Sequence, residues 1–506
     1  MEATLQLNPP SMMEQTPQFN VTSMMEQTPQ FNVSSMMEQT PQFSVTSMME
    51  QTPQFNVSSM MEQTPQFNVS SMMEQTPQFN VTSMMEQTPQ FNVSSMMEQT
   101  PQLNLSSMME QTPQFNVSSM MEQTPQFNLP LKMEATQQFN VPKVRSFHNI
   151  YCGGPLLEAV QKARLYADCK HFVDMPLKSD AEVTLNKWDE LVATGQMDNT
   201  ILQKFIDENF DQPGVGELED VQPTDFNPEF ESYNAIADPD YRAWARELHK
   251  KWPTLCRKVT QKVIDNPQKH SLIPLPNPFV VPGGRFREMY YWDSFFTIKG
   301  LLASGMISTA RGMIANMGDL IEKYGYVPNG NRVYYLNRSQ PPLLAWCLSA
   351  YFKATNDKEF IERGLKWLER EYQFFRLNRS FKLDAWPSPL FHYRVVAEGP
   401  RPESFREDVE CAEHLTNEED KRRLWGDIAA AAESGRDFSA RWFTSEGPVG
   451  GKMGSTRTSQ IMPVDLNAIM CGNLRTMAEL YEVVGQPQPA VECRAEYEAM
   501  RECIYQ

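Results

Sequence analysis

Apolar residues recur at helical spacing over several long stretches after residue 150. The first stretch consists of Ile307, Ala310, Ile314, Met317 and Ile321, which step by three and four residues. Such steps place the side chains on one face of a helix, and a following glycine, Gly325, is expected to end it. The same pattern is found in Phe360, Ile361, Leu365, Leu368, Tyr372 and Phe375, after Asp357, and in Leu466, Ile469, Met470, Leu474, Met477 and Leu480. Strand signals are scarce, so the pattern predicts an all-α region.

Long loops separate the predicted helices, at residues 276–293, 326–342, 382–406 and 443–463. Loops longer than about 12 residues in a compact domain usually have a function or are disordered. These loops are rich in aromatic residues, which argues against disorder. Pro341 and Pro342 stand where the next helix is expected to start, because the first turn of a helix tolerates a missing N–H donor. The expected arrangement is a toroid of helical hairpins with a site at the loop ends.

Residues 1–142 have a different pattern, a twelve-residue repeat of the form SMMEQTPQFNVT that runs ten times over residues 11–130. A period of twelve fits neither the helical repeat of about 3.6 residues nor a solenoid unit of about 20 residues or more. Each unit also contains a Pro, which removes a backbone donor. We therefore expect residues 1–142 to be a disordered tandem-repeat tail, with a stack of short β-arcs or an adhesive array as the alternative, and residues 143–506 to form the helical domain.

The acidity of the chain is concentrated in the repeats. Of the formal net charge of −18, residues 1–142 carry −11, because they hold 12 Glu and a single Lys, and residues 143–506 carry −7. A mildly acidic domain without a basic block argues against nucleic-acid binding. No run of 18 apolar residues occurs, so no transmembrane segment is expected. The eight Cys have neither a CxxC pair nor a Cys/His metal spacing, and both buried thiols and disulfides stay open.

Four of the loop segments share one chemistry, Arg together with carboxylate or amide side chains, and three of them add Tyr or Trp. They read PGGRFREMYYWDSF (282–295), PNGNRVYYLNRSQPP (328–342), EGPRPESFRED (398–408) and AAESGRDFSARW (431–442). Sugars need fixed donors and acceptors for their hydroxyls and aromatic faces for the C–H side of the ring. Taken singly, an Arg beside a Glu is more often a salt bridge, and Tyr290, Tyr291 and Trp292 fit an apolar core equally well. Four such loops in one chain favour a shared sugar site.

These motifs resemble the trehalases, the enzymes that hydrolyse α,α-trehalose. The segment at 282–295 is similar to the family's first signature and differs at Phe295, where the family favours Tyr. The stretch IYCGGPLLEAVQKARLYADCKHFVDMPLK, residues 150–178, resembles a segment of animal members. PNGNR, NRSQPP, RPES, ESGRDFSARW and PVDLN follow in the family's order, so the resemblance runs from residue 148 to residue 506.

The resemblance implies an (α/α)6 toroid and an inverting mechanism with two carboxylic acids and no metal or organic cofactor. It implies Asp437 as the general acid, which must hold a proton near neutral pH to protonate the glycosidic oxygen. Arg436 stands where the family usually has Trp, and a cation there favours the ionised acid unless it points away. The residues implied to line the sugar subsites are Arg285, Trp292, Asp293, Asn329, Arg338, Ser339, Gln340, Arg401, Glu403 and Gly435.

In trehalases the general base lies beyond the PVDLN motif, and this sequence ends before that segment. We therefore expect an incomplete toroid that lacks the base, with Glu492, Glu496, Glu498 and Glu502 on a solvated helix face. Three functions stay open: a trehalase, a catalytically impaired pseudoenzyme that at most binds the disaccharide, and an interaction protein whose repeats bind an unknown partner. The resemblance implies secretion or cell-surface attachment, but the N-terminal residues MEATLQLNPPSMMEQ carry no export signal, so the localisation is unknown.

Overall fold

The computed structural model of the chain describes residues 147–383 and 386–505, and between residues 6 and 140 it describes only the backbone of short strands. Contacts divide the chain into two units, Met1–Val144 and Arg145–Gln506, which are treated separately below. The boundary expected at residue 142 stays a prediction.

The described strands of the first unit are four-residue segments such as β2 (Gln18–Val21) and β6 (Gln42–Val45) and two-residue segments such as β3 (Met24–Met25). They pair in parallel with partners 24 residues away, so each strand meets the equivalent residues two repeats later. Such pairing is what the β-arc alternative requires. The residues between the strands lie outside the described part, and both expectations for this region, disorder and a β-arc stack, stay predictions.

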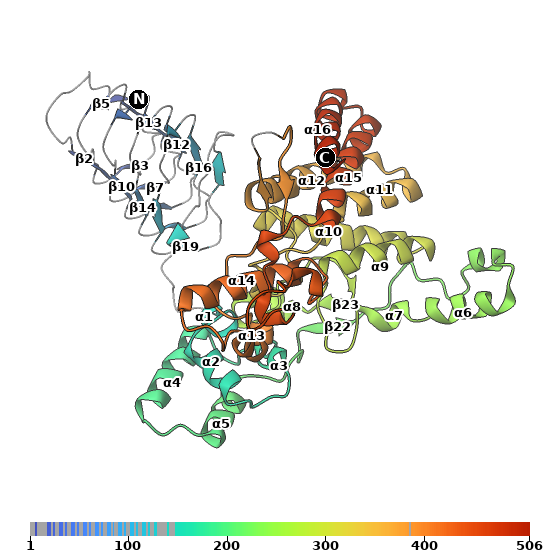
Figure 1. Cartoon of the computed structure of the whole chain (residues 1–506), viewed down its shortest axis with the longest axis horizontal. Helices are drawn as coiled ribbons and strands as arrows, with labels where there is room; N and C mark the ends of the chain where they lie inside the picture. The colour runs from blue at the N-terminus through green and yellow to red at the C-terminus, as the bar shows by residue number, and fades with distance from the viewer. Residues whose placement is uncertain are drawn as a thin grey trace. The chain divides into compact units, whose positions relative to one another are not determined.

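Three helical hairpins dominate the described part of the second unit (Figure 1). They are α9 (Tyr291–Ala303) with α10 (Ile307–Tyr324), α11 (Leu344–Thr355) with α12 (Lys358–Asn378), and α15 (Val464–Val483) with α16 (Pro487–Tyr505). The first helices, α9, α11 and α15, contact one another in turn, while α10 packs on α12 and α16 on α15. The mostly helical fold is therefore confirmed, and the hairpins form an arc of an α/α toroid.

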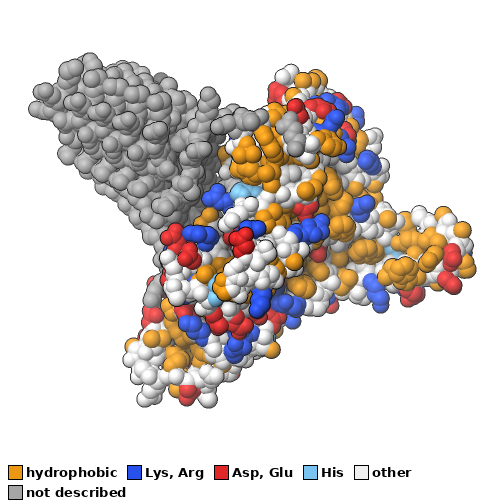
Figure 2. All heavy atoms as spheres, in the orientation of Figure 1, with side chains coloured by type: hydrophobic (Ala, Val, Ile, Leu, Met, Phe, Trp, Pro, Cys, Tyr) orange, Lys and Arg blue, Asp and Glu red, His pale blue; other side chains and the backbone are white. Residues whose placement is uncertain are grey.

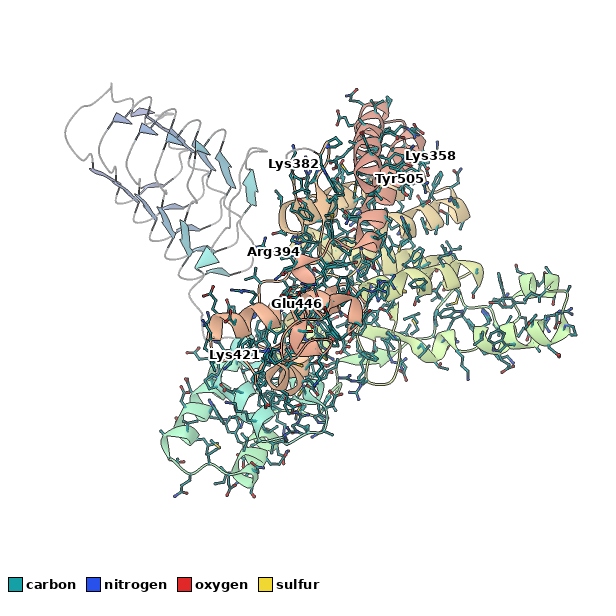
Figure 3. The ribbon with its side chains drawn as sticks, in the orientation of Figure 1. Lys358, Lys382, Arg394, Lys421, Glu446 and Tyr505 are labelled. Atoms are coloured by element: carbon teal, nitrogen blue, oxygen red, sulfur yellow. The ribbon has the colours of Figure 1, made fainter. Side chains whose placement is uncertain are left out.

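The three helices predicted from apolar spacing are confirmed, and their ends have local causes. At the end of α10, Gly325 adopts a φ of 82°, a left-handed conformation that glycine takes without a Cβ clash. At the start of α12, the side chain of Asp357 accepts a hydrogen bond from the backbone N–H of Phe360 at 3.1 Å. Lys358, labelled in Figure 3, is the first residue of this helix, whereas the labelled Lys382 lies four residues beyond its last residue, Asn378. Helix α11 begins at Leu344, just after the Pro341–Pro342 pair.

Ten further helices and five strands accompany the hairpins in the described part of the second unit. The helices are α1 (His148–Tyr151), α2 (Pro155–Lys162), α3 (Cys169–Val173), α4 (Ala181–Ala193), α5 (Asn199–Asn209), α6 (Pro239–His249), α7 (Trp252–Leu255), α8 (Gln261–Asp265), α13 (Phe405–Cys411) and α14 (Glu418–Glu433). Strands β22 (Leu218–Asp220), β23 (Cys256–Val259) and β24 (Phe279–Val280) form an antiparallel sheet, and β25 (Ser380–Phe381) pairs with β26 (Leu390–Phe391). Short 3-10 turns at Val333–Tyr335 and Pro402–Ser404 lie inside two of the predicted loops.

The surface of the described residues has one helix whose apolar side is open to solvent. On α6, Tyr241, Trp244 and Leu248 follow at steps of three and four residues and are 64, 62 and 52% exposed (Figure 2). Among the described residues, no helix is both long and apolar enough to cross a membrane.

The late acidic residues differ from the expectation in one position. Glu492, Glu498 and Glu502 are exposed on α16, as expected of a solvated face. Glu496 is partly buried instead, and it accepts hydrogen bonds from the hydroxyl of Tyr372 at 2.8 Å and from Arg376 at 3.3 Å, both on α12. Glu496 therefore joins two helices rather than facing water alone.

Candidate active site

The aromatic residues of the 282–295 segment differ in their burial. Tyr290 and Tyr291 are buried, so the core interpretation holds for them, whereas Trp292 is only partly buried at the start of α9. Asp293 is exposed in the first turn of α9, and partial desolvation of its carboxyl raises its pKa. Trp292 and Asp293 are therefore accessible to solvent at the start of α9.

A buried cluster of charges fixes the loop that precedes α9. Glu288 accepts hydrogen bonds from Arg332 at 2.6 Å, from Lys170 at 2.7 Å and from the hydroxyl of Tyr290 at 2.8 Å. Burial acts to raise the pKa of Glu288, but Arg332 and Lys170 outweigh it and hold the pKa at about 2. Arg332 also forms an ion pair with Glu217 at 3.0 Å. Removing one partner would leave a buried charge uncompensated, so this cluster holds the loop before α9 in place.

The segment before α11 supplies an arginine and an amide. Arg338 donates to Asn329 Oδ1 at 3.1 Å and to Glu403 Oε1 at 2.6 Å, and its guanidinium lies 5.0 Å from the centre of the Tyr335 ring. Gln340 Oε1 accepts from the backbone N–H of Trp292 at 3.1 Å. These contacts join the first signature, the 328–342 loop and the 398–408 loop.

Ser339 has a different place from its neighbours. It is fully buried, its hydroxyl donates to the carbonyl of Val327 at 2.6 Å, and its N–H donates to Glu433 Oε1 at 2.8 Å. Glu433 is in turn held by the guanidinium of Arg379 at 2.8 and 2.9 Å. The contacts of Ser339 are therefore internal, and they fix the backbone between Arg338 and Gln340.

The 398–408 loop contributes a second arginine and a carboxylate. Asp408 accepts from Arg401 through both oxygens, at 2.9 Å from Nε and 2.6 Å from a terminal nitrogen. Burial disfavours the charge of Arg401, but Asp408 outweighs it and the pKa of Arg401 is raised. Burial likewise acts to raise the pKa of Glu403, but Arg338 and Arg401 hold it below its usual value. Glu403 Oε2 is buried and has no hydrogen-bond partner among the described residues.

The loop after α14 brings Asp437 to this group. Gly435 packs so closely against Trp292 that a Cβ at Gly435 would lie 2.7 Å from Cζ2 of the indole. The guanidinium of Arg401 lies 4.9 Å from the centre of the Phe438 ring, and the charge of Asp437 adds to the rise of the Arg401 pKa. Asp437 itself is exposed, beside this arginine.

Arg436 pairs with a carboxylate other than that of the expected acid. Its Nε donates to Asp465 Oδ2 at 2.6 Å, in the first turn of α15. Its backbone N–H donates to Ser434 Oγ at 3.0 Å, and its carbonyl accepts from the indole of Trp442 at 3.1 Å. The effect of Arg436 on Asp437 stays a prediction.

Arg285 lies at the edge of the cluster. It is half exposed and donates to Asp168 Oδ1 at 2.7 Å. Aromatic rings connect Arg285 to Arg338. The guanidinium of Arg285 lies 5.4 Å from the centre of the Phe286 ring, and that ring is edge-on to the Tyr290 ring with 5.7 Å between their centres. Tyr290 contacts Tyr335, the ring beneath Arg338, also at 5.7 Å.

Direct contacts join the predicted residues in two sets: Arg338 contacts Asn329 and Glu403, and Trp292 contacts Gln340 and Gly435. Arg401 acts on Glu403 and Asp437 acts on Arg401 through their charges, while Arg285 and Asp293 are exposed and Ser339 is internal. The sequence reasoning missed the partners that hold the arginines, Asp168, Asp408 and Asp465. Asp408 lies seven residues after Arg401, within the same loop segment, whereas Asp168 lies 117 residues before Arg285 and gives no local signal.

An arc of helical hairpins, with arginines, carboxylates and an indole at its loop ends, defines a class of α/α-toroid protein with a polar site between loops. The sequence model of the family "Trehalase" matches residues 164–506. Trehalase from Tenebrio molitor is 42% identical over 341 residues, 66% of this chain and 61% of that protein. Trehalases from Oryctolagus cuniculus and Homo sapiens are 42 and 43% identical, over 68% of this chain and 60 and 59% of theirs.

This chain therefore belongs to the trehalase family. It spans about 60% of the length of these relatives. Among solved structures, neutral trehalase Nth1 from Saccharomyces cerevisiae is similar with a TM-score of 0.38 and 18% identity, over 57% of this chain and 63% of that chain.

Proposed function

We propose that the chain binds α,α-trehalose at this site and that Asp437 is the general acid of a glycoside hydrolase of the trehalase type. Three observations support the proposal: Trp292 contacts Gln340 and Gly435, Arg338 contacts Glu403, and the charge of Asp437 acts on Arg401. Arginines and carboxylates fixed by one another offer directed donors and acceptors to sugar hydroxyls, and the partly buried indole offers a face to the ring.

In the proposed reaction, Asp437 donates its proton to the oxygen that bridges the two glucose units as that bond breaks. A second carboxylate, about 6.5–9.5 Å away, takes a proton from the attacking water on the opposite face of the ring. Attack on the opposite face inverts one anomeric carbon, so the products are one β-glucose and one α-glucose. We assign the base to no residue of this chain.

The test separates binding from turnover. We expect isothermal titration calorimetry of the purified chain to show trehalose binding that Trp292→Ala weakens and Asp437→Asn largely keeps. Glucose release is assayed on the same chain. Binding with turnover supports the glycoside hydrolase, binding without turnover supports the disaccharide-binding alternative, and absence of binding in the folded chain contradicts the site.

A further inference from the structure

A buried carboxyl outside the site described above contacts the elements that carry it. Glu371 lies on α12 and is only 3% exposed. Its Oε1 accepts a hydrogen bond from the hydroxyl of Tyr291 at 2.6 Å, and the same hydroxyl accepts from the backbone N–H of Leu344 at 3.1 Å. Tyr291 directly precedes Trp292, and Leu344 is the first residue of α11, four residues after Gln340. One phenol oxygen therefore joins Glu371 to the first turns of two site-bearing helices.

Glu371 also borders a small cavity behind the 328–342 loop. The cavity is lined by Pro342, Leu368, Glu371, Tyr372, Phe375, Met470, Asn473 and Met477, and its room for the centre of a water molecule is ≈ 10 Å³. That is space for about one water. Asn473 donates to the carbonyl of Pro342 at 2.9 Å, while its Oδ1 is buried without a hydrogen-bond partner among the described residues. Asn473 Oδ1 is therefore available in this cavity as an acceptor for the proton of a protonated Glu371.

In the described part of the chain, no cation is found among the groups that influence the pKa of Glu371. Tyr291 faces it from α9, Cys347 from α11 and Asn473 from α15, and Tyr372 is its neighbour on α12. Burial raises the pKa of Glu371 to about 7, with the Tyr291 hydrogen bond acting against the rise. The pKa of Tyr291 is raised by its own burial and then by Glu371, so the phenol keeps its proton.

We propose that Glu371 is a positioning residue of the candidate trehalose site, which holds the first turns of α9 and α11 through Tyr291 by a hydrogen bond whose strength depends on its protonation. This inference rests on the proposed function only in the measurement of trehalose affinity. When Glu371 is ionised, the Tyr291 hydroxyl donates to a carboxylate, and hydrogen bonds to charged groups are roughly twice as strong as neutral ones. When Glu371 is protonated, Tyr291 donates to a neutral carboxyl and the acid proton faces the cavity acceptor. The site is therefore held most firmly above neutral pH.

The experiment measures the site with and without sugar on the full chain. The chain is labelled with 5-fluorotryptophan and the Trp292 resonance is assigned with Trp292→Phe. ¹⁹F NMR is recorded at about 1.5 pH units below and above the pKa of about 7 that burial gives Glu371, and at points between. We expect the Trp292 resonance to titrate in the wild type and to lose this titration in Glu371→Gln. The matched control is Glu362→Gln, an exposed residue of the same helix, which keeps the wild-type titration.

Trehalose affinity is measured over the same range. We expect the wild type to bind about tenfold more tightly at the upper end of the range, and Glu371→Gln to bind weakly and with no pH dependence. If Glu371→Gln fails to fold, Tyr291→Phe serves the same purpose, because it removes the hydroxyl that links Glu371 to Trp292. An unchanged Trp292 titration in the folded Glu371→Gln or Tyr291→Phe chain overturns the proposal. A titrating Trp292 without any trehalose binding contradicts the proposed function and leaves the positioning role of Glu371 supported.

Discussion

The contact between Gly435 and Trp292 allows the placement of Trp292 to be tested by adding one methyl group at Gly435. Gly435 has a φ of 65°, and an added Cβ would lie 2.7 Å from the indole of Trp292. We expect Gly435→Ala to push the indole aside and to weaken trehalose binding about tenfold or more, because overpacking typically costs about 1–3 kcal/mol. Calorimetric titration with trehalose measures the change.

The matched control is Gly485→Ala. Gly485 has a similar φ of 76°, but an added Cβ there would meet nothing within 4 Å. Both substitutions carry a similar backbone strain of about 1–2 kcal/mol, and only the first carries a clash with the site. Equal trehalose affinity in the two variants contradicts the placement of Trp292 against the loop of the expected acid.

The helix α12 links the site to the stability of the hairpins through Glu371. Its pKa of about 7 in the folded chain lies above the ordinary value of 4.5, so the folded state binds more protons than the unfolded state between these values. The free energy of unfolding therefore contains a contribution that is present below about pH 4.5 and lost as pH rises to about 7. The difference is about 3 kcal/mol, at about 1.4 kcal/mol for each unit of pKa.

Thermal melts at a series of pH values check this prediction. We expect Glu371→Gln to have a higher melting temperature than the wild type near pH 8, because the amide need not ionise, and no such advantage near pH 5. Glu362→Gln, on the exposed side of α12, is expected to follow the wild type throughout. If Glu371→Gln is less stable than the wild type near pH 8, the prediction is wrong. In that case, charged or polar partners stabilise the Glu371 carboxylate by more than its burial costs.

For the whole molecule, the repeats and the helical domain are expected to act independently. All the residues that we place in the site lie after residue 284, whereas the repeats end before residue 143. We expect deletion of residues 1–142 to leave the trehalose affinity unchanged in a calorimetric titration. A marked loss of affinity in a folded deletion variant supports the third function considered for this sequence, in which the repeats are the working part.

The sequence predicts the long helices better than it predicts what holds the site. Steps of three and four residues predict α10, α12 and α15 because each buries one apolar face, and Asp357 and Gly325 are local end signals. The site loops were found from their shared Arg, carboxylate and aromatic content, and the role of each residue was implied by the resemblance to a family. Contacts such as Glu433 with Arg379, 54 residues apart, follow from packing of distant elements and leave no local pattern.

The most direct measurement of the central claim is a crystal structure of this chain with trehalose bound. We predict that the bridging oxygen lies within hydrogen-bond distance of the Asp437 carboxyl, that the Trp292 indole lies against a sugar ring, and that Arg338 and Glu403 contact hydroxyl groups. A sugar bound elsewhere, or bound here with Asp437 far from the bridging oxygen, contradicts the account.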